Sequence, residues 1–211
     1  RFSYQDVSGR RFEGLEISLA GKHQVENAAL AVETVGRLAE CGYPVSERQL
    51  CKGLASAVWQ GRFQIIAKRP LFILDGAHNE DAAKKLARSI RFYFTNKKIV
   101  YIMGMLKDKE CEKVAAETCA YAEQIITVTP PDNPRALPAL ELAQIVREYH
   151  PHVTAAGSLE EGVEMAYLLA DKEDVILCFG SLSYLGRMEE IVRERQEKVH
   201  TEKNMHVGKK A

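Results

Sequence analysis

The spacing of hydrophobic residues changes near residue 60 and divides the sequence into two parts. Residues 1–19 alternate apolar and polar positions, which predicts two short strands joined by a turn. Apolar residues then recur at helical spacing over 24–41. Ser46, with Gln49 three residues later, predicts a capping box that opens a second helix. We expect this first part to complete a sheet whose other strands lie elsewhere.

Beyond residue 60, short runs of consecutive apolar residues alternate with stretches of helical spacing. The expected strands are 62–68, 71–74, 99–103, 125–128, 153–155 and 175–179. The expected helices cover about 81–94, 111–122, 139–149 and 159–170, with a last helix reaching about residue 198 and a polar tail over 200–211. Continuously apolar strands separated by helices predict an α/β fold, in which a mostly parallel sheet is covered by helices on both faces.

Charge and cysteine content narrow the classes of partner and the cellular compartment. The 29 Lys and Arg residues balance 29 Asp and Glu residues, so electrostatics favour neither nucleic acid nor an anionic membrane as a partner. Five scattered cysteines without a Cys-x-x-Cys pair are typical of reduced thiols in a cytoplasmic protein. No run approaches the ~20 apolar residues of a membrane span. The chain opens at Arg1 on a strand-like run, and we expect it to be part of a longer protein.

Polar residues gather at the expected carboxyl ends of four strands, where ligands bind in open α/β sheets. They lie in the segments Asp75–Asn79, Lys107–Lys109, Thr129–Pro134 and Ser181–Ser183. Each has a structural alternative: Asp75 and Asn79 could cap the following helix, the lysines could be solvated, and the serines could cap the last helix. Arg62, after Gly61, could be an ordinary surface arginine. The joint occurrence of polar groups at one sheet edge favours a binding site.

Several nucleotide-binding and catalytic motifs do not occur in the sequence. There is no Gly-x-x-x-x-Gly-Lys-[Ser/Thr] loop to bind phosphates. No Gly-x-Gly-x-x-Gly follows a strand, which argues against a nicotinamide cofactor, and there is no His-Glu-x-x-His motif or nucleophile elbow. We therefore expect the chain to lack the phosphate-binding residues that it would need to act alone on a nucleoside triphosphate.

Five segments occur in an order that matches one protein family. They are Gly21–Ala28 (GKHQVENA), Gly61–Gln64 (GRFQ), Leu74–Asn79 (LDGAHN), Gly104–Lys109 (GMLKDK) and Phe179–Leu182 (FGSL). Through them the chain resembles folylpolyglutamate synthases and dihydrofolate synthases of the Mur ligase superfamily. The resemblance implies a Rossmann-like carboxy-terminal domain over 61–199, preceded over 1–60 by a small remnant of the central ATPase domain.

The resemblance also implies roles for residues at the nucleotide. Asn27 is similar to the asparagine that contacts adenine, and Asp75 to the aspartate that binds the ribose. Arg62 resembles the arginine that reaches the outer ATP phosphates, and His78 resembles a histidine near both the nucleotide and the incoming glutamate. Arg62 and His78 are therefore the expected catalytic residues, with ATP as the cofactor.

Roles for the other substrates follow from the same resemblance. Lys109 and Ser181 are expected to hold glutamate, although Lys109 stands in Asp-Lys-Glu where the family often has Asp-Lys-Asp. The ligands of Mg2+ and the segments that bind folate belong to the amino-terminal part of the family, outside this chain. The implied partners are ATP, L-glutamate, a reduced folate or dihydropteroate, and the amino-terminal ATPase domain.

The expected function is ATP-dependent addition of glutamate to a folate through an acyl phosphate, with the chain inactive by itself. One alternative is another Mur-type ligase that adds an amino acid to a cell-wall precursor; His23–Gln24 and Asp75–Asn79 favour the folate branch. A second alternative is a non-catalytic module that binds a nucleotide or an amino acid. Arg62 argues against that module, because binding alone does not require an arginine directed at phosphates.

Overall fold

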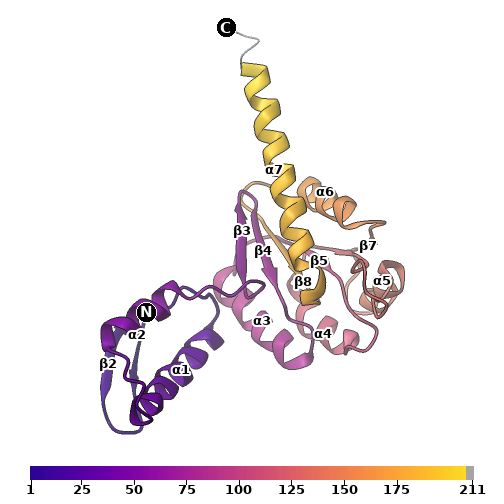
Figure 1. The fold of residues 1–211 in the computed structure, drawn as a ribbon. Coiled ribbons are helices and arrows are strands. Elements are labelled where there is room, and N and C mark those ends of the chain that lie inside the picture. The colour runs from indigo at the N-terminus through magenta and orange to yellow at the C-terminus, as the bar shows by residue number, and fades with distance from the viewer. Residues whose placement is uncertain (208–211) are drawn as a thin grey trace. The chain divides into compact units, whose positions relative to one another are not determined.

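The computed structural model describes residues 1–207, in which the chain divides into two compact units. Unit 1 is Arg1–Gln64, and unit 2 begins at Ile65. Figure 1 shows the helices and strands of both units. Within residues 1–207, none of the helices is both long and apolar enough to cross a membrane.

Unit 1 is a two-stranded antiparallel sheet with two helices. Its elements are β1 (Phe2–Gln5), β2 (Arg11–Leu15), α1 (Lys22–Glu40) and α2 (Glu47–Ser56). Ala28 and Val32 of α1 lie one helical turn apart and are buried against Leu50 and Leu54 of α2 and against Leu15 of β2. The expected helices are therefore present, and one small apolar core holds this unit together.

The capping box predicted at Ser46 is confirmed. Ser46 Oγ accepts a hydrogen bond from the Gln49 backbone N at 3.3 Å, and Gln49 Oε1 accepts one from the Ser46 backbone N at 2.9 Å. These two bonds satisfy amide groups that the start of a helix otherwise leaves without partners. The helix α2 therefore begins where the sequence predicts.

Unit 2 is built on a six-stranded sheet in the order β3-β4-β8-β5-β6-β7. The strands are β3 (Gln64–Lys68), β4 (Leu71–Asp75), β5 (Ile99–Met103), β6 (Gln124–Thr127), β7 (Val153–Ala155) and β8 (Val175–Phe179). Between β4 and β7 every neighbouring pair is parallel, which confirms the predicted mostly parallel α/β sheet. The strand β3 joins β4 through the two-residue turn Arg69–Pro70 and forms the edge of the sheet.

Helices cover both faces of this sheet, as the continuously apolar strands predict (Figure 1). The helices are α3 (Glu80–Tyr93), α4 (Cys111–Thr118), α5 (Ala139–Arg147), α6 (Leu159–Leu169) and α7 (Leu185–Val207), with single 3-10 turns at Cys119–Tyr121 and Leu182–Tyr184. On one face, Val163 of α6 and Met188 of α7 share a core cluster with Ile102 and Ile176 of the strands. The helices α3, α4 and α5 contact one another in sequence on the other side.

The expected end of the last helix, near residue 198, is wrong. The helix α7 continues to Val207. The reason is local: no glycine or proline interrupts the sequence between Gly186 and Gly208, and Glu, Lys and Arg, which favour helix, fill much of that stretch. The rest of the expected polar tail, 208–211, lies outside the described residues.

Two glycines let the ends of β5 and β8 approach each other closely. Gly180 has a φ of +116°, and a Cβ atom there would lie 2.4 Å from the carbonyl oxygen of Gly104. The Gly104 backbone N donates to the Phe179 carbonyl oxygen at 3.1 Å. Tyr184 Oη donates to the same oxygen at 2.7 Å, and its ring lies 3.0 Å from where a Cβ of Gly104 would stand. Gly180 therefore has to be glycine, and a side chain at Gly104 would press on the ring of Tyr184.

We expect Gly180→Ala to destabilise unit 2 by at least about 2 kcal/mol, because it combines an unfavourable φ with overpacking against backbone. Urea unfolding measures this loss. Gly186→Ala is the matched control, since a Cβ there meets nothing within 4 Å. That control should leave the unfolding free energy equal or raise it by up to about 1 kcal/mol, as alanine replaces glycine in a helix. Equal unfolding midpoints for the Gly180 variant and the wild type would contradict the packing described here.

Burial also predicts which thiols react in the folded protein. Burial raises the pKa of Cys111 to about 11 and the pKa values of Cys119 and Cys178 to about 12, whereas Cys41 is exposed. Because the thiolate is the reactive form, Cys41 should react with a thiol reagent at pH 8 while these three react only on unfolding. Mass spectrometry of labelled peptides, with and without urea, gives the result. Rapid labelling of native Cys178 would show that the interior of unit 2 is more open than described.

Candidate functional site

A pocket in unit 1 brings together two residues that the sequence assigns to a nucleotide. Its volume is about 190 Å3, and Leu19, Gln24, Asn27, Trp59 and Arg62 line it. Asn27 comes from the start of α1, whereas Arg62 follows α2, so the chain must fold back to place both in one pocket. The expected adenine contact and the expected phosphate contact therefore share a single cavity.

The first turn of α1 supplies a row of polar side chains beside this pocket. Asn27 Nδ2 donates to Gln24 Oε1 at 3.0 Å, and Gln24 Nε2 lies 2.9 Å from His23 Nε2. Gln24 is only 4% exposed, so its amide is held among other groups of the unit rather than in water. Asn27 is exposed and can meet a ligand.

Sequence reasoning assigned no ligand contact to three residues that line the pocket, Leu19, Gln24 and Trp59. Trp59 is 66% exposed, which is uncommon for so large an apolar side chain in a folded unit. The available signals were the position of Trp59 just before the Gly61-Arg62 pair and the glutamine in the segment GKHQVENA. None of these residues carries a charge or a reactive group, so their place in the pocket can be recognised only from the fold.

Arg62 lies between two residues with an unusual backbone conformation. Gly61 has a φ of +68° and Phe63 a φ of +48°, so Arg62 stands between two residues in the left-handed region. For phenylalanine this conformation costs about 1–3 kcal/mol, and burial of the side chain, which is 6% exposed, offsets it. The Gly61 backbone N donates to Gln64 Oε1 at 2.8 Å and closes the loop. Arg62 therefore lies on a constrained turn.

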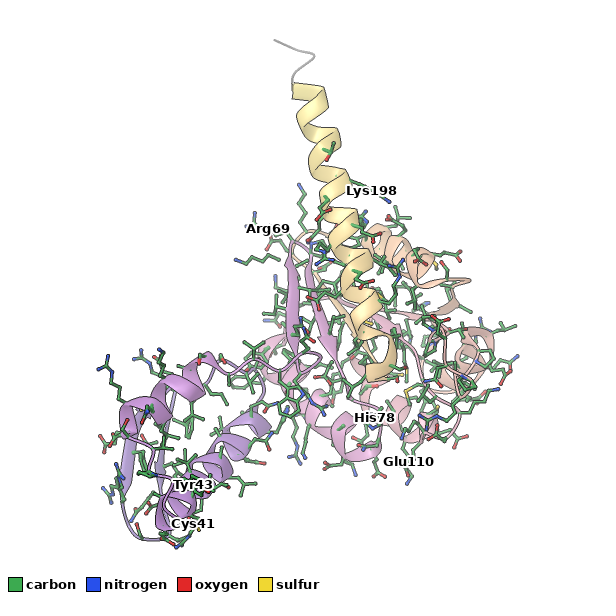
Figure 2. All side chains as sticks on the ribbon, viewed as in Figure 1. Cys41, Tyr43, Arg69, His78, Glu110 and Lys198 are labelled. Atoms are coloured by element: carbon green, nitrogen blue, oxygen red, sulfur yellow. The ribbon has the colours of Figure 1, made fainter. Side chains whose placement is uncertain are left out.

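In unit 2, the predicted site residues lie along one edge of the sheet. Asp75 at the end of β4 is in register with Phe179 of β8, and Met103 of β5 is in register with the same Phe179. The segments that follow these three adjacent strands carry His78, Lys109 and Ser181. Figure 2 shows His78 and Glu110, at the starts of α3 and α4, at one end of unit 2, whereas Arg69 and Lys198 lie toward the opposite end.

For the segment after β4, the sequence left open whether Asp75 and Asn79 belong to a binding site or cap the following helix. Asn79 caps α3, because its Oδ1 accepts from the Ala82 backbone N at 2.9 Å. Asp75 does not cap the helix; its Oδ1 accepts from the Ala77 backbone N at 2.8 Å, and the residue is 7% exposed. The structural alternative is therefore confirmed for Asn79, while Asp75 is held at the strand end by its own turn.

His78 has a defined tautomer in this arrangement. Its Nδ1 lies 2.8 Å from the Gly76 carbonyl oxygen, and since a carbonyl can only accept, Nδ1 must donate its proton. In the neutral imidazole, Nε2 is then a hydrogen-bond acceptor. His78 can accordingly accept a proton or a hydrogen bond from a bound group through Nε2.

The segment after β5 is tied to the Pro-rich segment after β6. Lys109 Nζ lies 3.6 Å from Asp108 Oδ2, and Arg135 Nη1 lies 3.2 Å from the same oxygen. The Lys107 backbone N donates to the Arg135 carbonyl oxygen at 2.8 Å. Two cations therefore flank one carboxylate and leave a positive excess suited to a carboxylate ligand. Sequence reasoning missed Arg135, although the Pro-rich segment just before it was singled out.

Ser181 is largely engaged by its own short helical turn. It is 5% exposed, its Oγ accepts from the Ser183 backbone N at 3.2 Å, and it lies 2.9 Å from Ser183 Oγ. The capping alternative is confirmed for the 3-10 turn at Leu182–Tyr184. These contacts within its own turn therefore set the direction of the Ser181 hydroxyl at the sheet edge.

The structure brings the six predicted residues together as two groups. Asn27 and Arg62 share the pocket of unit 1, whereas Asp75, His78, Lys109 and Ser181 follow adjacent strands of unit 2. Among residues 1–207, no group of three or more His, Cys, Asp or Glu side chains is arranged to hold a metal ion. The six predicted residues supply hydrogen-bonding groups, one carboxylate, two cations and one imidazole.

Comparisons with known proteins agree with this arrangement. Residues 61–182 match the family profile described as "Mur ligase, glutamate ligase domain". A folylpolyglutamate synthase of Lacticaseibacillus casei is 34% identical over 139 residues, which are 65% of this chain and 32% of that protein.

Two solved structures have a similar fold. A complex of Escherichia coli FolC with DHPP and ADP is 28% identical with a TM-score of 0.78, and the match covers 92% of this chain and 44% of that one. A folylpolyglutamate synthase/dihydrofolate synthase of Yersinia pestis, complexed with AMPPNP and Mn ion, is 25% identical with a TM-score of 0.72, covering 87% and 42%.

The chain spans a third to less than half of the length of these relatives. The matched profile covers more than half of the chain, from the Gly61-Arg62 turn to the 3-10 turn that follows β8. It includes all four predicted residues of the sheet edge. The chain belongs to the Mur ligase family, and residues 61–182 are its glutamate ligase domain.

Proposed function

We propose that this chain is the carboxy-terminal part of an ATP-dependent ligase that adds glutamate to a folate. The observation that carries the proposal is that Asn27 and Arg62, which come from two of the five family-like segments, line one cavity. Membership of the Mur ligase family and similarity to folylpolyglutamate synthases support the same assignment. The folate would be a reduced folate or dihydropteroate, and the FolC complex with DHPP and ADP supports a substrate of this type.

The chemistry requires that a carboxylate be activated before an amine can attack it. In the proposed reaction, a carboxylate oxygen of the folate takes the terminal phosphoryl group of ATP and releases ADP. The amine of glutamate attacks the resulting acyl phosphate, and a tetrahedral anion forms. Phosphate then leaves as the amide bond is completed, and the amine loses a proton. The protein must therefore stabilise charge on phosphate and position an amine.

The residues at the nucleotide suit the first of these tasks. Arg62 has a planar fork that can bond two phosphoryl oxygens at once, and its turn holds it in a defined direction. Asp75 can accept hydrogen bonds from the ribose hydroxyls, and Asn27 can bond the base. Mg2+ bound with ATP would neutralise phosphate charge; we assign its ligands to a part of the protein beyond this chain.

The residues at glutamate suit the second task. Lys109 and the neighbouring Arg135 supply positive charge for the carboxylates of glutamate, and Ser181 supplies a hydroxyl. His78 Nε2 can accept a hydrogen bond from the amine and take the proton that the amine loses. A cytosolic location belongs to the same proposal, since the five scattered cysteines fit a reducing compartment.

Replacing Arg62 tests the role assigned at phosphate. In the full-length protein, Arg62→Ala should lower kcat about 100- to 1,000-fold, because a charge-stabilising group is lost in the transition state. Steady-state release of ADP, measured with folate and glutamate saturating, gives kcat. Arg193→Ala, at an exposed arginine of α7, is the matched control and should leave kcat unchanged. An unchanged rate in the Arg62 variant, with folding confirmed by circular dichroism, would remove the phosphate role.

The 211-residue chain by itself should show no ligation. It contains no Gly-x-x-x-x-Gly-Lys-[Ser/Thr] loop, so the phosphates of ATP would lack the backbone cradle that aligns them for transfer. Mass spectrometry of the folate after incubation with ATP, Mg2+ and glutamate measures the product, and the full-length protein is the positive control. Accumulation of a glutamylated folate with the chain alone would contradict this prediction.

A further inference from the structure

The buried hydroxyl of Tyr184 closes the segment that follows β8. Tyr184 is 0% exposed, and its Oη donates to the Phe179 carbonyl oxygen at 2.7 Å. This bond joins the last residue of β8 to the last residue of the 3-10 turn that comes after it. The segment Gly180–Ser183 is therefore held at both ends, by the sheet and by Tyr184.

The chemistry of the atoms gives this contact a single direction. A carbonyl oxygen can only accept, so the one proton of the Tyr184 hydroxyl is used on Phe179. The Tyr184 oxygen is then left to accept, and Cys178 Sγ donates to it at 3.4 Å. Burial raises the pKa of Tyr184 well above its usual value and the pKa of Cys178 to about 12, so both groups keep their protons at neutral pH. The hydroxyl therefore stays bonded to the end of β8.

Ser181 lies inside the segment that Tyr184 closes. Its Oγ accepts from the Ser183 backbone N at 3.2 Å, and Ser183 directly precedes Tyr184 in the chain. On the other side stands Gly180, whose backbone has many accessible conformations because it lacks a side chain. The direction of the Ser181 hydroxyl therefore depends on a contact beyond its two neighbours, and Tyr184 supplies that contact.

We propose that Tyr184 is a positioning residue, whose hydroxyl holds the segment after β8 so that Ser181 presents its own hydroxyl to a carboxylate of the incoming glutamate. The inference rests on the proposed function in one respect, the placement of glutamate at Ser181. It goes further in naming a fully buried residue, out of reach of any ligand, on which the binding of glutamate depends.

Tyr184→Phe tests this role, because it removes the hydroxyl and keeps the ring that packs beside Gly104. In the full-length protein it should raise the KM for glutamate about five- to tenfold, the effect of one displaced hydrogen bond. It should leave kcat and the KM for ATP within about twofold, since Ser181 would contact glutamate equally before and during attack. Steady-state release of ADP, with each substrate varied in turn, gives these constants.

Tyr101→Phe is the matched control. Tyr101 is also 0% exposed, and its Oη donates to the Thr118 carbonyl oxygen at 3.1 Å. Its ring lies 5.1 Å from the ring of Phe179, so both tyrosines contact the last residue of β8. Each variant loses one buried hydroxyl–carbonyl bond and should lose a similar amount of unfolding free energy, but only Tyr184→Phe should change the KM for glutamate. Equal KM values in the two variants would overturn the inference.

Ser181→Ala shows whether Tyr184 acts through Ser181. In the Ser181→Ala protein, Tyr184→Phe should have no further effect on the KM for glutamate, because the hydroxyl that it would displace is already absent. If the two substitutions instead raise the KM independently, so that their effects multiply, Tyr184 does not act through Ser181 and the inference is wrong.

Hydrogen exchange separates this inference from the proposed function, because it requires no turnover. Mass spectrometry of the full-length protein measures amide exchange over residues 180–185, which should be about threefold faster or more in Tyr184→Phe and unchanged in Tyr101→Phe. Unchanged exchange in Tyr184→Phe would overturn the inference. If exchange is faster but the full-length wild type ligates no glutamate, the proposed function is overturned, while the positioning of Ser181 by Tyr184 is supported.

Discussion

The close approach of Gly104 to Gly180 is the constraint on which the rest of unit 2 depends. A side chain at Gly180 would overlap the Gly104 carbonyl oxygen, so the carboxyl ends of β5 and β8 can meet in this way only because residue 180 is glycine. The buried hydroxyl of Tyr184 and the Gly104 backbone N both donate to the Phe179 carbonyl oxygen there. The segments that carry Lys109 and Ser181 start from this junction, and its packing determines where they leave the sheet.

Backbone conformation has the same role in unit 1, on a smaller scale. Arg62 stands on a turn in which Gly61 and Phe63 both have positive φ, and burial of Phe63 offsets the unfavourable conformation. In α1, the buried Gln24 accepts a hydrogen bond from Asn27 Nδ2. In both cases a buried residue supports a neighbour for which we propose a ligand contact. Substitution of such a supporting residue can displace the polar group beside it without removing that group.

The division of the predicted residues between two units fits the proposed reaction. The groups suited to the base and phosphates lie in unit 1, whereas those suited to ribose and glutamate lie at the sheet edge of unit 2. A ligase that first activates a carboxylate and then admits an amine must exclude water between the two steps. Each unit by itself therefore holds groups suited to part of the proposed substrates.

The sequence by itself determined most of the elements and the family. Apolar spacing located nearly every strand and helix, and β5 and β8 have the predicted bounds, because local periodicity reflects which face of an element is buried. The sequence also identified the strand-end residues, since parallel strands place their carboxyl ends at one edge. Its main error in local structure, the end of α7, arose at a polar segment without periodicity.

Only the tertiary structure decided the strand order, in which the last strand, β8, lies between β4 and β5. Pairing between strands distant in sequence depends on long-range packing that no local pattern encodes. The same holds for the contacts of Gln24, Trp59 and Arg135. Gln24 lies within a family-like segment, but its neighbours, like those of Trp59 and Arg135, are apparent only in the folded chain. Neutral amides and aromatic rings are common in any sequence, and only their position in space distinguishes a supporting residue from an ordinary one.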